Sequence, residues 1–182
     1  MEYTHVKHTF LPVYNEESRI LILGSFPSVK SRENQFYYGH PQNRFWKVIA
    51  GIFKEPLPQT IDEKEDLLLR HRIAVWDVID SCDIVGSSDS SIRNVVPNDM
   101  NLILSNAKIQ GIFANGGKAH QLFVKYCHKE GMPPLGKLPS TSPANAAWNL
   151  ERLTAEWKTA FETYLEITEQ EKTFEKRRNE NG

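Results

Sequence analysis

The sequence predicts an α/β fold with three layers, α/β/α, around a central, mainly parallel four-stranded sheet. Short apolar, β-branched runs alternate along the chain with segments whose apolar residues recur at helical spacing. This alternation is typical of a parallel sheet with helices on both faces. The run at 73–79, IAVWDVI, is almost wholly apolar, as expected of a strand buried on both faces. Because no internal repeat or linker interrupts the chain, residues 1–182 are expected to form a single domain.

The individual elements follow from the same patterns. Strands of the core sheet are predicted at 20–23, 73–79, 109–114 and about 137–138. Helices are predicted at 45–53, from Asp62 as the cap to about Arg70, at 100–107 with Asn98 or Asp99 as the cap, at 119–126 and at 150–165. Residues 1–18 are expected to form an edge strand or a lead-in packed on the sheet, the Ser- and Asp-rich residues 81–91 a loop, and the charged residues 168–182 a frayed tail.

The composition is that of a soluble globular protein, with 40% hydrophobic and 25% charged residues. No apolar run approaches the length of a membrane span, and the N-terminus lacks the basic-then-apolar order of a signal peptide, so a cytoplasmic protein is expected. Cys82 and Cys127 match no metal-ligand spacing and are expected to be reduced thiols. The net charge is −1, so binding to nucleic acid would require a local basic surface.

The stretch from Arg19 to Phe53 has the pattern of a ligand-binding loop. A buried strand ends at Gly24, and the segment GSFPS at 24–28 then turns the chain out of the sheet. A polar loop with three aromatic residues follows and ends in HPQN at 40–43, after which the chain re-enters the core as a helix. Because open α/β sheets bind ligands at the carboxyl ends of their strands, we expect this loop to line the active site.

Several chemistries are poorly supported by the residue types. The opening loop carries only one acid, Glu33, so a two-carboxylate glycoside hydrolase is disfavoured. The chain lacks HExxH and CxxC spacings, a phosphate loop and a G-x-S-x-G elbow. The remaining groups are backbone amides, aromatic faces, hydroxyls and a side-chain amide. Such groups can stack a planar ring, hydrogen-bond its edge and position a water molecule.

Two motifs resemble those of the uracil-DNA glycosylase superfamily. GSFPS followed by YYGHPQNRFWKVI looks like the first motif of that superfamily, and LPSTSPANA, which begins at Leu138, is similar to its second motif, a Pro-Ser turn that enters the duplex. The segment FANGGKA, which follows the third strand, fits the shared pattern more weakly. The resemblance covers about residues 19–165 and implies a DNA glycosylase that acts on duplex DNA containing a deaminated base.

The departures from the superfamily pattern indicate one of its branches. The mismatch-specific uracil/thymine glycosylases carry an asparagine two residues after the first glycine, where this sequence has Phe26. Relatives also carry a histidine or asparagine before the Pro-Ser turn, where this sequence has Leu138. Both differences favour the hypoxanthine-DNA (deoxyinosine) branch. In that branch an asparagine of the HPxN region is thought to be catalytic, and the matching residue is Asn43.

The resemblance and the chemistry together imply roles for the loop residues. Asn43 is expected to orient a water or contact the base, although an asparagine directly before an apolar-periodic run is also a preferred helix N-cap. Tyr38 is expected to stack on the base, and His40 to donate to a base oxygen or to a phosphate. The expected base-binding residues are Gly24, Ser25, Phe26, Pro27, Ser28, Tyr38 and His40, and the expected DNA-binding residues are Ser140, Thr141, Ser142 and Asn145. No metal and no cofactor are expected, and we expect a monomer.

Three alternatives stay open at the level of the sequence. The substrate could be uracil or mismatched thymine, against which Phe26 speaks. The protein could also be a non-catalytic module that binds damaged DNA, in which Asn43 is only a cap. A third possibility is an enzyme of free nucleosides, which would not need the hydroxyl-rich loop at 140–142.

Overall fold

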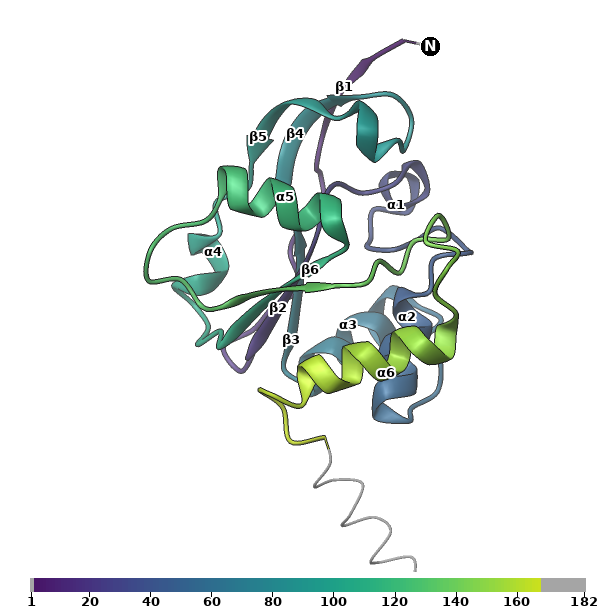
Figure 1. Ribbon diagram of the computed structural model, residues 1–182, viewed down its shortest axis with the longest axis vertical. Coiled ribbons are helices and arrows are strands. Elements are labelled where there is room, and N and C mark those ends of the chain that lie inside the picture. The colour runs from purple at the N-terminus through teal and green to yellow at the C-terminus, as the bar shows by residue number, and fades with distance from the viewer. Residues whose placement is uncertain (1, 168–182) are drawn as a thin grey trace, which may run out of the picture.

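The computed structural model describes residues 2–167 and has a four-stranded parallel sheet at its centre (Figure 1). The strands are ordered β3-β2-β6-β7 and comprise β2 (Ile20–Gly24), β3 (Ile73–Asp77), β6 (Gly111–Asn115) and β7 (Leu135–Leu138). In the central strand β2, Ile22 pairs with Val75 on one side and with Phe113 on the other. Helices cover both faces of this sheet, so the predicted α/β/α fold is confirmed.

The helices lie in two groups on either side of the sheet (Figure 1). One group contains α2 (Phe45–Phe53), α3 (Ile61–Arg70) and α6 (Leu150–Phe161), and α2 packs against α6. The other contains α4 (Asn101–Leu104) and α5 (Gly117–Tyr126). A short helix that the sequence did not predict, α1 (Val29–Asn34), follows the GSFPS turn.

Two helix starts differ from the sequence prediction. The N-cap of α3 is Thr60 and not Asp62, because the Thr60 hydroxyl accepts a hydrogen bond from the Glu63 N–H at 3.1 Å. Helix α4 is shorter than predicted and begins after Met100, although the Asp99 carboxylate still accepts from the Asn101 N–H at 3.0 Å. Asp62 instead lies in the first turn of α3, where a carboxylate interacts favourably with the helix dipole.

The largest difference from the prediction is a second, antiparallel sheet of β1 (Thr4–Lys7), β4 (Ile79–Ile84) and β5 (Arg93–Pro97) in the order β1-β4-β5. The predicted strand at 73–79 ends at Asp77, and the chain bends at Val78, whose N–H donates to Gly24 O at 2.9 Å. Residues 81–84 therefore form a strand and not a loop. Their Ser and Asp side chains suggested a loop, but pairing with β1 and β5 satisfies the backbone on both edges.

The remaining parts of the chain pack against this framework. The expected lead-in is confirmed at Val13, which is buried and forms an antiparallel bridge with Val75 of β3. The short helix η1 (Asp89–Ser91) lies within the segment predicted to be a loop. The predicted tail at 168–182 lies outside the described residues. Among residues 2–167, none of the helices is long and apolar enough to cross a membrane.

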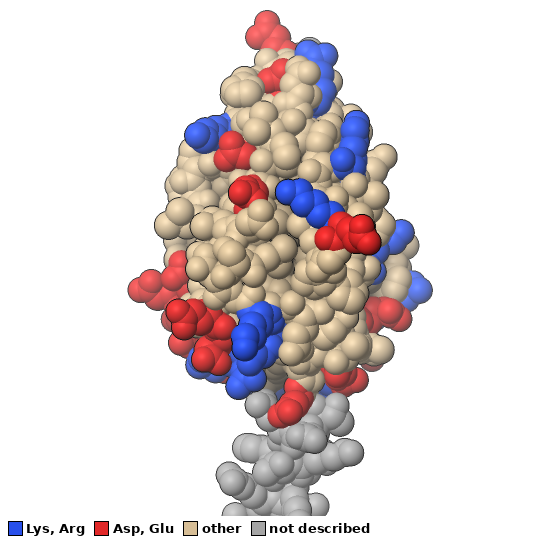
Figure 2. Space-filling model, turned by 90° about the vertical axis from the view of Figure 1, so that its left-hand side faces the viewer, with Lys and Arg blue, Asp and Glu red and all other residues tan. Residues whose placement is uncertain are grey.

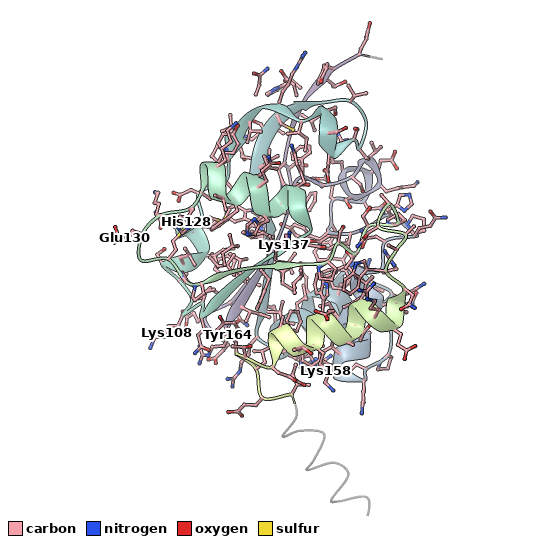
Figure 3. The ribbon with its side chains drawn as sticks, viewed as in Figure 1. Lys108, His128, Glu130, Lys137, Lys158 and Tyr164 are labelled. Atoms are coloured by element: carbon pink, nitrogen blue, oxygen red, sulfur yellow. The ribbon has the colours of Figure 1, made fainter. Side chains whose placement is uncertain are left out.

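Close packing at the start of β6 restricts that position to glycine. Tyr164, which follows α6, lies against Gly111 (Figure 3). A Cβ atom at position 111 would lie 2.4 Å from Tyr164 Cε2, which is well inside van der Waals contact. Gly117, at the start of α5, has no heavy atom within 4 Å of the equivalent position.

We therefore expect Gly111→Ala to lower the free energy of unfolding by about 1–3 kcal/mol, because the added methyl group must displace an aromatic ring. Gly117→Ala is the matched control and is expected to be neutral or slightly stabilising, since the space around it is open. Urea unfolding of the two variants checks this, and equal stability of both would contradict the close contact.

Candidate active site

A cavity of about 300 Å³ lies at the carboxyl ends of the parallel strands. It contains the loop predicted to be the active site together with residues from four other parts of the chain. Its lining comprises Gly24–Ser28, Ser31, Tyr37, Tyr38, His40, Asn43, Asp77, Ser87, Asp89, Asn115 and Ser140–Pro143. Of the residues predicted for the site, only Asn145 lies outside this lining, and it borders an adjoining groove.

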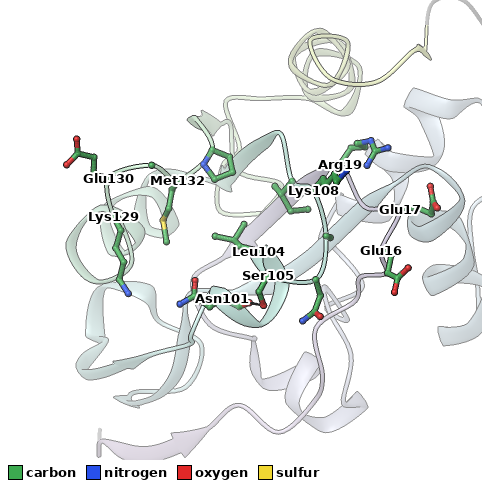
Figure 4. A pocket seen from close by; sticks show the side chains of 15 residues that line it. Glu16, Glu17, Arg19, Asn101, Leu104, Ser105, Lys108, Lys129, Glu130 and Met132 are labelled. Carbon is green, nitrogen blue, oxygen red and sulfur yellow. Dashed lines mark hydrogen bonds between the residues drawn. The ribbon is translucent and has the colours of Figure 1, made fainter.

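A larger concavity, of about 840 Å³, lies at the opposite edge of the sheet (Figure 4). It is lined by segments that precede β2, β6 and β7, including Arg19, Lys108 and Pro133. Its charged side chains are spread around the rim and do not converge on one point (Figure 4). Because parallel sheets bind ligands at the carboxyl ends of their strands, the smaller cavity is the better candidate.

Asn43 combines a structural contact with a free donor group. The N-cap position of α2 belongs to Arg44, but Asn43 Oδ1 accepts from the Phe45 N–H at 2.9 Å and from the Thr141 hydroxyl at 2.9 Å. These two donors occupy both lone pairs of the oxygen. Within residues 2–167, Nδ2 of Asn43 makes no hydrogen bond, and the residue lines the cavity. Asn43 therefore supports the start of α2 and can still donate to a bound molecule.

Thr141 links Asn43 to the central sheet. Its hydroxyl donates to Asn43 and accepts from Asn115 Nδ2 at 3.0 Å, while its backbone N–H donates to Asn115 Oδ1 at 3.0 Å. Thr141 is 0% exposed, so its side chain lies beneath the surface that a phosphate could reach. Asn115 was not predicted to belong to the site, although its place at the end of the third strand was a usable signal.

Arg44 fastens the second loop to the start of α2. Its guanidinium donates to the backbone carbonyls of Ser142 at 2.8 Å and Asn145 at 3.1 Å, and also to that of Trp148. Its backbone N–H donates to Thr141 O at 3.1 Å. With a longer contact from Nε to Thr141 O at 3.5 Å, a single side chain thus holds four carbonyls of the loop in place.

The second loop presents hydroxyl groups beside a groove of about 640 Å³. Ser140 Oγ accepts from the Ser142 N–H at 3.1 Å, and Ser142 Oγ accepts from the Ala144 N–H at 3.2 Å. Both hydroxyl protons thus remain available to an acceptor such as a phosphate. Asn145 Nδ2 donates to Ser140 O at 3.0 Å and braces the turn. Lys137 of β7 (Figure 3) and Lys118 of α5 line the groove together with the carboxylates of Asp89 and Glu156.

The turn after β2 and His40 offer further donors to the cavity. The backbone N–H groups of Phe26 and Ser28 make no hydrogen bond within residues 2–167. His40 Nδ1 accepts from the Gln42 N–H at 3.1 Å, so a neutral imidazole carries its proton on Nε2. Ser25 is engaged differently, because its hydroxyl donates to Asp89 Oδ1 at 2.9 Å and joins the turn to the loop above it. Desolvation raises the pKa of Asp89, and the Ser25 hydroxyl and Lys118 oppose this shift.

Tyr38 is held with its hydroxyl inside the protein. Its ring stacks on Phe45 with a centroid separation of 4.0 Å and an interplanar angle of 21°, so one ring face is already covered. Its backbone adopts the left-handed region with φ of 53°. The hydroxyl is buried without a hydrogen-bond partner among the described residues. Desolvation and the charge of Asp77 raise the pKa of Tyr38, and the nearby amide of Asn115 opposes the shift.

A buried acid–imidazole pair forms the floor of the cavity. Asp77 ends β3 and is 4% exposed, and its Oδ2 lies 2.9 Å from Nε2 of His8, which is 7% exposed. Gly24 crosses directly above this carboxylate, since a Cβ at that position would lie 2.4 Å from Asp77 Oδ1. The sequence placed Asp77 at the correct edge but favoured a capping role. His8 was missed because 69 residues separate it from its partner.

The structure shows no large field of one sign on the face seen in Figure 2, where Lys and Arg alternate with Asp and Glu. This agrees with the net charge of −1. Electrostatic attraction of DNA would therefore have to come from individual basic side chains near the site. Within residues 2–167, no group of three or more His, Cys, Asp and Glu side chains lies close enough to hold a metal ion.

Comparisons with known proteins agree with the motifs. The family profile "Uracil DNA glycosylase superfamily" matches residues 11–166. A protein named "Hypoxanthine DNA glycosylase" from Methanosarcina acetivorans is 36% identical over 159 residues, which are 86% of this chain and 98% of that protein. A protein of the same name from Methanosarcina barkeri is 35% identical over 116 residues, or 62% of this chain and 73% of that protein.

The fold has a counterpart among solved structures. A solution NMR structure from M. acetivorans, solved as a candidate uracil DNA glycosylase, superposes with a TM-score of 0.69 at 34% identity. The match covers 84% of this chain and 94% of that chain. The architecture, the two motifs around the cavity and the profile match over most of the chain lead to one conclusion: the chain belongs to the uracil-DNA glycosylase superfamily.

Proposed function

We propose that the protein is a monofunctional DNA glycosylase that removes hypoxanthine from deoxyinosine in duplex DNA and leaves an abasic site. The observation that carries this proposal is the orientation of Asn43. Its oxygen is held by two donors, and its Nδ2 is left free in a cavity lined with further donors. The two Methanosarcina relatives named hypoxanthine DNA glycosylase support this choice of base.

The reaction exchanges one bond to the sugar for another. The bond between C1′ and N9 of the purine breaks with its electron pair moving to the base, and a water oxygen bonds to C1′. One proton of that water goes to the departing base, so the products are neutral hypoxanthine and an abasic deoxyribose. Positive charge develops on the sugar and negative charge on the base, and donors aimed at the base stabilise that transition state.

Asn43 acts in this scheme as a donor to the base. Because both lone pairs of Oδ1 are occupied, the side chain has no acceptor left for a proton of the attacking water. Its Nδ2–H can instead hydrogen-bond a ring nitrogen or oxygen of the purine as charge accumulates there. The N–H groups of Phe26 and Ser28 and His40 Nε2–H supply further donors from the same wall.

The DNA strand is expected to run along the second loop. The free hydroxyl protons of Ser140 and Ser142 and the adjoining lysines can contact flanking phosphates, which positions the duplex without reading its sequence. Asn145 braces this loop and borders the same groove. For Thr141 we propose a positioning role and not a phosphate contact, because it is buried beneath the loop.

The first prediction concerns Asn43 itself. Asn43→Ala is expected to slow excision of hypoxanthine by about 10²–10³-fold, because it removes a donor to the developing charge. Asn149→Ala is the matched control, since Asn149 Oδ1 caps α6 at a distance from the cavity by accepting from the Arg152 N–H at 2.8 Å. Each variant should lose about 1 kcal/mol of stability with its backbone contact. Only Asn43→Ala should lose activity.

The assay uses duplexes with one deoxyinosine, one deoxyuridine or one mismatched thymidine, followed by alkaline cleavage at abasic sites and a denaturing gel. We expect the deoxyinosine duplex to be cleaved faster than the other two duplexes. Cleavage of only the uracil or thymine duplex would show that hypoxanthine is not the substrate and that uracil or thymine is. No product from any duplex would favour a non-catalytic DNA-binding module, and faster release from free deoxyinosine than from the duplex would favour a nucleoside hydrolase.

The second prediction concerns Arg44. Arg44→Met keeps the apolar stem but removes four hydrogen bonds to loop carbonyls. We expect amide hydrogen exchange at 139–149 to accelerate and affinity for duplex DNA to fall by about tenfold, since each lost charge-assisted bond costs on the order of 1 kcal/mol or more. Arg70→Met is the control, because its guanidinium is half exposed in pairs with Asp66 and Glu55. Equal rates of amide hydrogen exchange at 139–149 in the two variants would show that Arg44 does not hold the loop in place.

A further inference from the structure

The cavity and the adjoining groove meet at four residues that line both of them, namely Asp89, Asn115, Ser140 and Ser142. A nucleotide whose base lies in the cavity while its phosphates follow the groove must place its sugar at this junction. The C1′ carbon, at which the glycosidic bond breaks, is therefore expected beside these four residues. Asn43 lines the cavity but not the groove, which places it on the side of the base.

Asp89 is the ionisable member of the four. The amide of Asn115 is already engaged through its oxygen and its nitrogen, and the hydroxyls of Ser140 and Ser142 are poor proton acceptors near neutral pH. Asp89 Oδ1 accepts from the Ser25 hydroxyl at 2.9 Å, but its Oδ2 makes no hydrogen bond within residues 2–167. The junction thus offers one carboxylate oxygen that can accept a proton.

The segment that carries Asp89 is fixed against the turn after β2 and the helix α1. In addition to the contact of Asp89 with the turn, the Val29 N–H donates to Ser87 Oγ at 2.8 Å. Arg32 Nη2 donates to Gly86 O at 2.7 Å. These bonds place the carboxylate before a substrate binds, which lowers the entropy cost of using it in a reaction.

The surroundings of Asp89 suit a proton acceptor. Solvent reaches the residue, yet the cavity wall partly desolvates its carboxylate, and this raises the pKa of Asp89. The Ser25 hydroxyl and Lys118 oppose the shift, and the charge of Asp77 adds to it. Asp77 itself lies beneath Gly24 and is 4% exposed, so it is removed from a sugar at the junction. A carboxylate beside a groove for DNA repels phosphates, so DNA binding does not explain Asp89.

We propose that Asp89 is a catalytic carboxylate that binds the attacking water, with its Oδ2 accepting a proton from that water as the oxygen bonds to C1′. This inference rests on the proposed function and adds the group that activates the water. Asn43 cannot do so, because its Oδ1 is already occupied by two donors. The ionised carboxylate also stabilises the positive charge that develops on the sugar.

The step balances in protons and electrons. The electron pair of the C1′–N9 bond leaves with the base, and the water oxygen bonds to C1′ while one of its protons moves to Asp89. The carboxyl group then releases this proton through solvent to the departed base, which restores the carboxylate. The products are again neutral hypoxanthine and an abasic deoxyribose.

Asp89→Asn tests this role, since the asparagine oxygen can still accept from the Ser25 hydroxyl while a neutral amide does not take up a proton. With excess protein and a duplex carrying one deoxyinosine, the single-turnover rate of excision is expected to fall by about 10²-fold or more. Affinity is measured with a 2′-fluoro deoxyinosine duplex, which resists hydrolysis. It should be unchanged or higher, because a negative charge beside the phosphates is removed.

Asp99→Asn is the matched control. Asp99 Oδ1 also accepts one hydrogen bond, from the Asn101 N–H at 3.0 Å, and the residue lies outside the linings of the cavity and the groove. This variant should change neither the rate of excision nor the affinity for DNA.

The pH dependence of the excision rate separates catalysis from support of the loop. The wild-type rate is expected to fall as the pH drops through the raised pKa of Asp89, because a protonated carboxyl group cannot accept a proton. The groups that face this carboxyl are Ser25, Lys118 and Asp77. Asp89→Asn should lack the fall. Ser25→Ala should keep it and move it to higher pH, since a hydrogen bond that lowers the pKa of Asp89 is lost.

The outcomes separate this inference from the proposed function. A wild-type rate of excision in Asp89→Asn, or the same fall at low pH in this variant, would overturn the role of Asp89. Loss of rate and affinity together would also overturn it, because Asp89 would then only support the loop. If Asp89→Asn does not fold, an unshifted pH profile of Ser25→Ala would contradict the role. Failure of the wild type to release hypoxanthine from a deoxyinosine duplex at any pH would overturn the proposed function instead.

Discussion

The site depends on the hydrogen bonds that Thr141 makes beneath the second loop. Its hydroxyl donates to Asn43 Oδ1 and accepts from Asn115 Nδ2, and its backbone N–H donates to Asn115 Oδ1. Three elements that are distant in sequence thus share one buried node: the end of β6, the start of α2 and the loop after β7. Because Thr141 is fully buried, each of its polar groups must be paired, and this requirement fixes the amide of Asn43 in one orientation. Arg44 then secures the same loop from the side.

A second constraint acts at the opposite end of the cavity. The chain must pass over Asp77 without a side chain, and Gly24 provides that passage. The carboxylate beneath is restrained by His8 from the N-terminal segment, which also meets the parallel sheet through the bridge of Val13 with Val75. The small sheet of β1, β4 and β5 explains how His8 reaches this position, because β1 ends at Lys7 and places His8 beside β3. The small sheet of β1, β4 and β5 therefore helps to position Asp77, which lines the cavity.

The sequence predicted the parts of this design that are local in the chain. The strand and turn at 20–28, the helix after Asn43 and the final helix follow from periodicity and turn residues, and the structure confirms them. The larger failures share one physical cause, since the accessory sheet and the contact of His8 depend on distant partners. Residues 81–84 carry loop-like side chains and become a strand only because β1 and β5 lie beside them. His8 has no local signature, because its role arises from a contact across 69 residues, whereas Asn115 was marked only by its place at the end of a strand and contacts Thr141 across 26 residues.

The contacts of Asn43 indicate what its amide can contribute to the proposed glycosylase reaction. The mismatch-specific glycosylases carry an asparagine at the position that Phe26 occupies in this chain. An amide that orients a water molecule needs its oxygen free, and the oxygen of Asn43 is already used twice. In the proposed mechanism its contribution therefore comes from Nδ2, as stabilisation of the departing base. Such a mechanism requires the base to be held closely so that the donor meets it as charge develops. The two contacts to Oδ1, from the Phe45 N–H and the Thr141 hydroxyl, keep that donor in one orientation at the cavity.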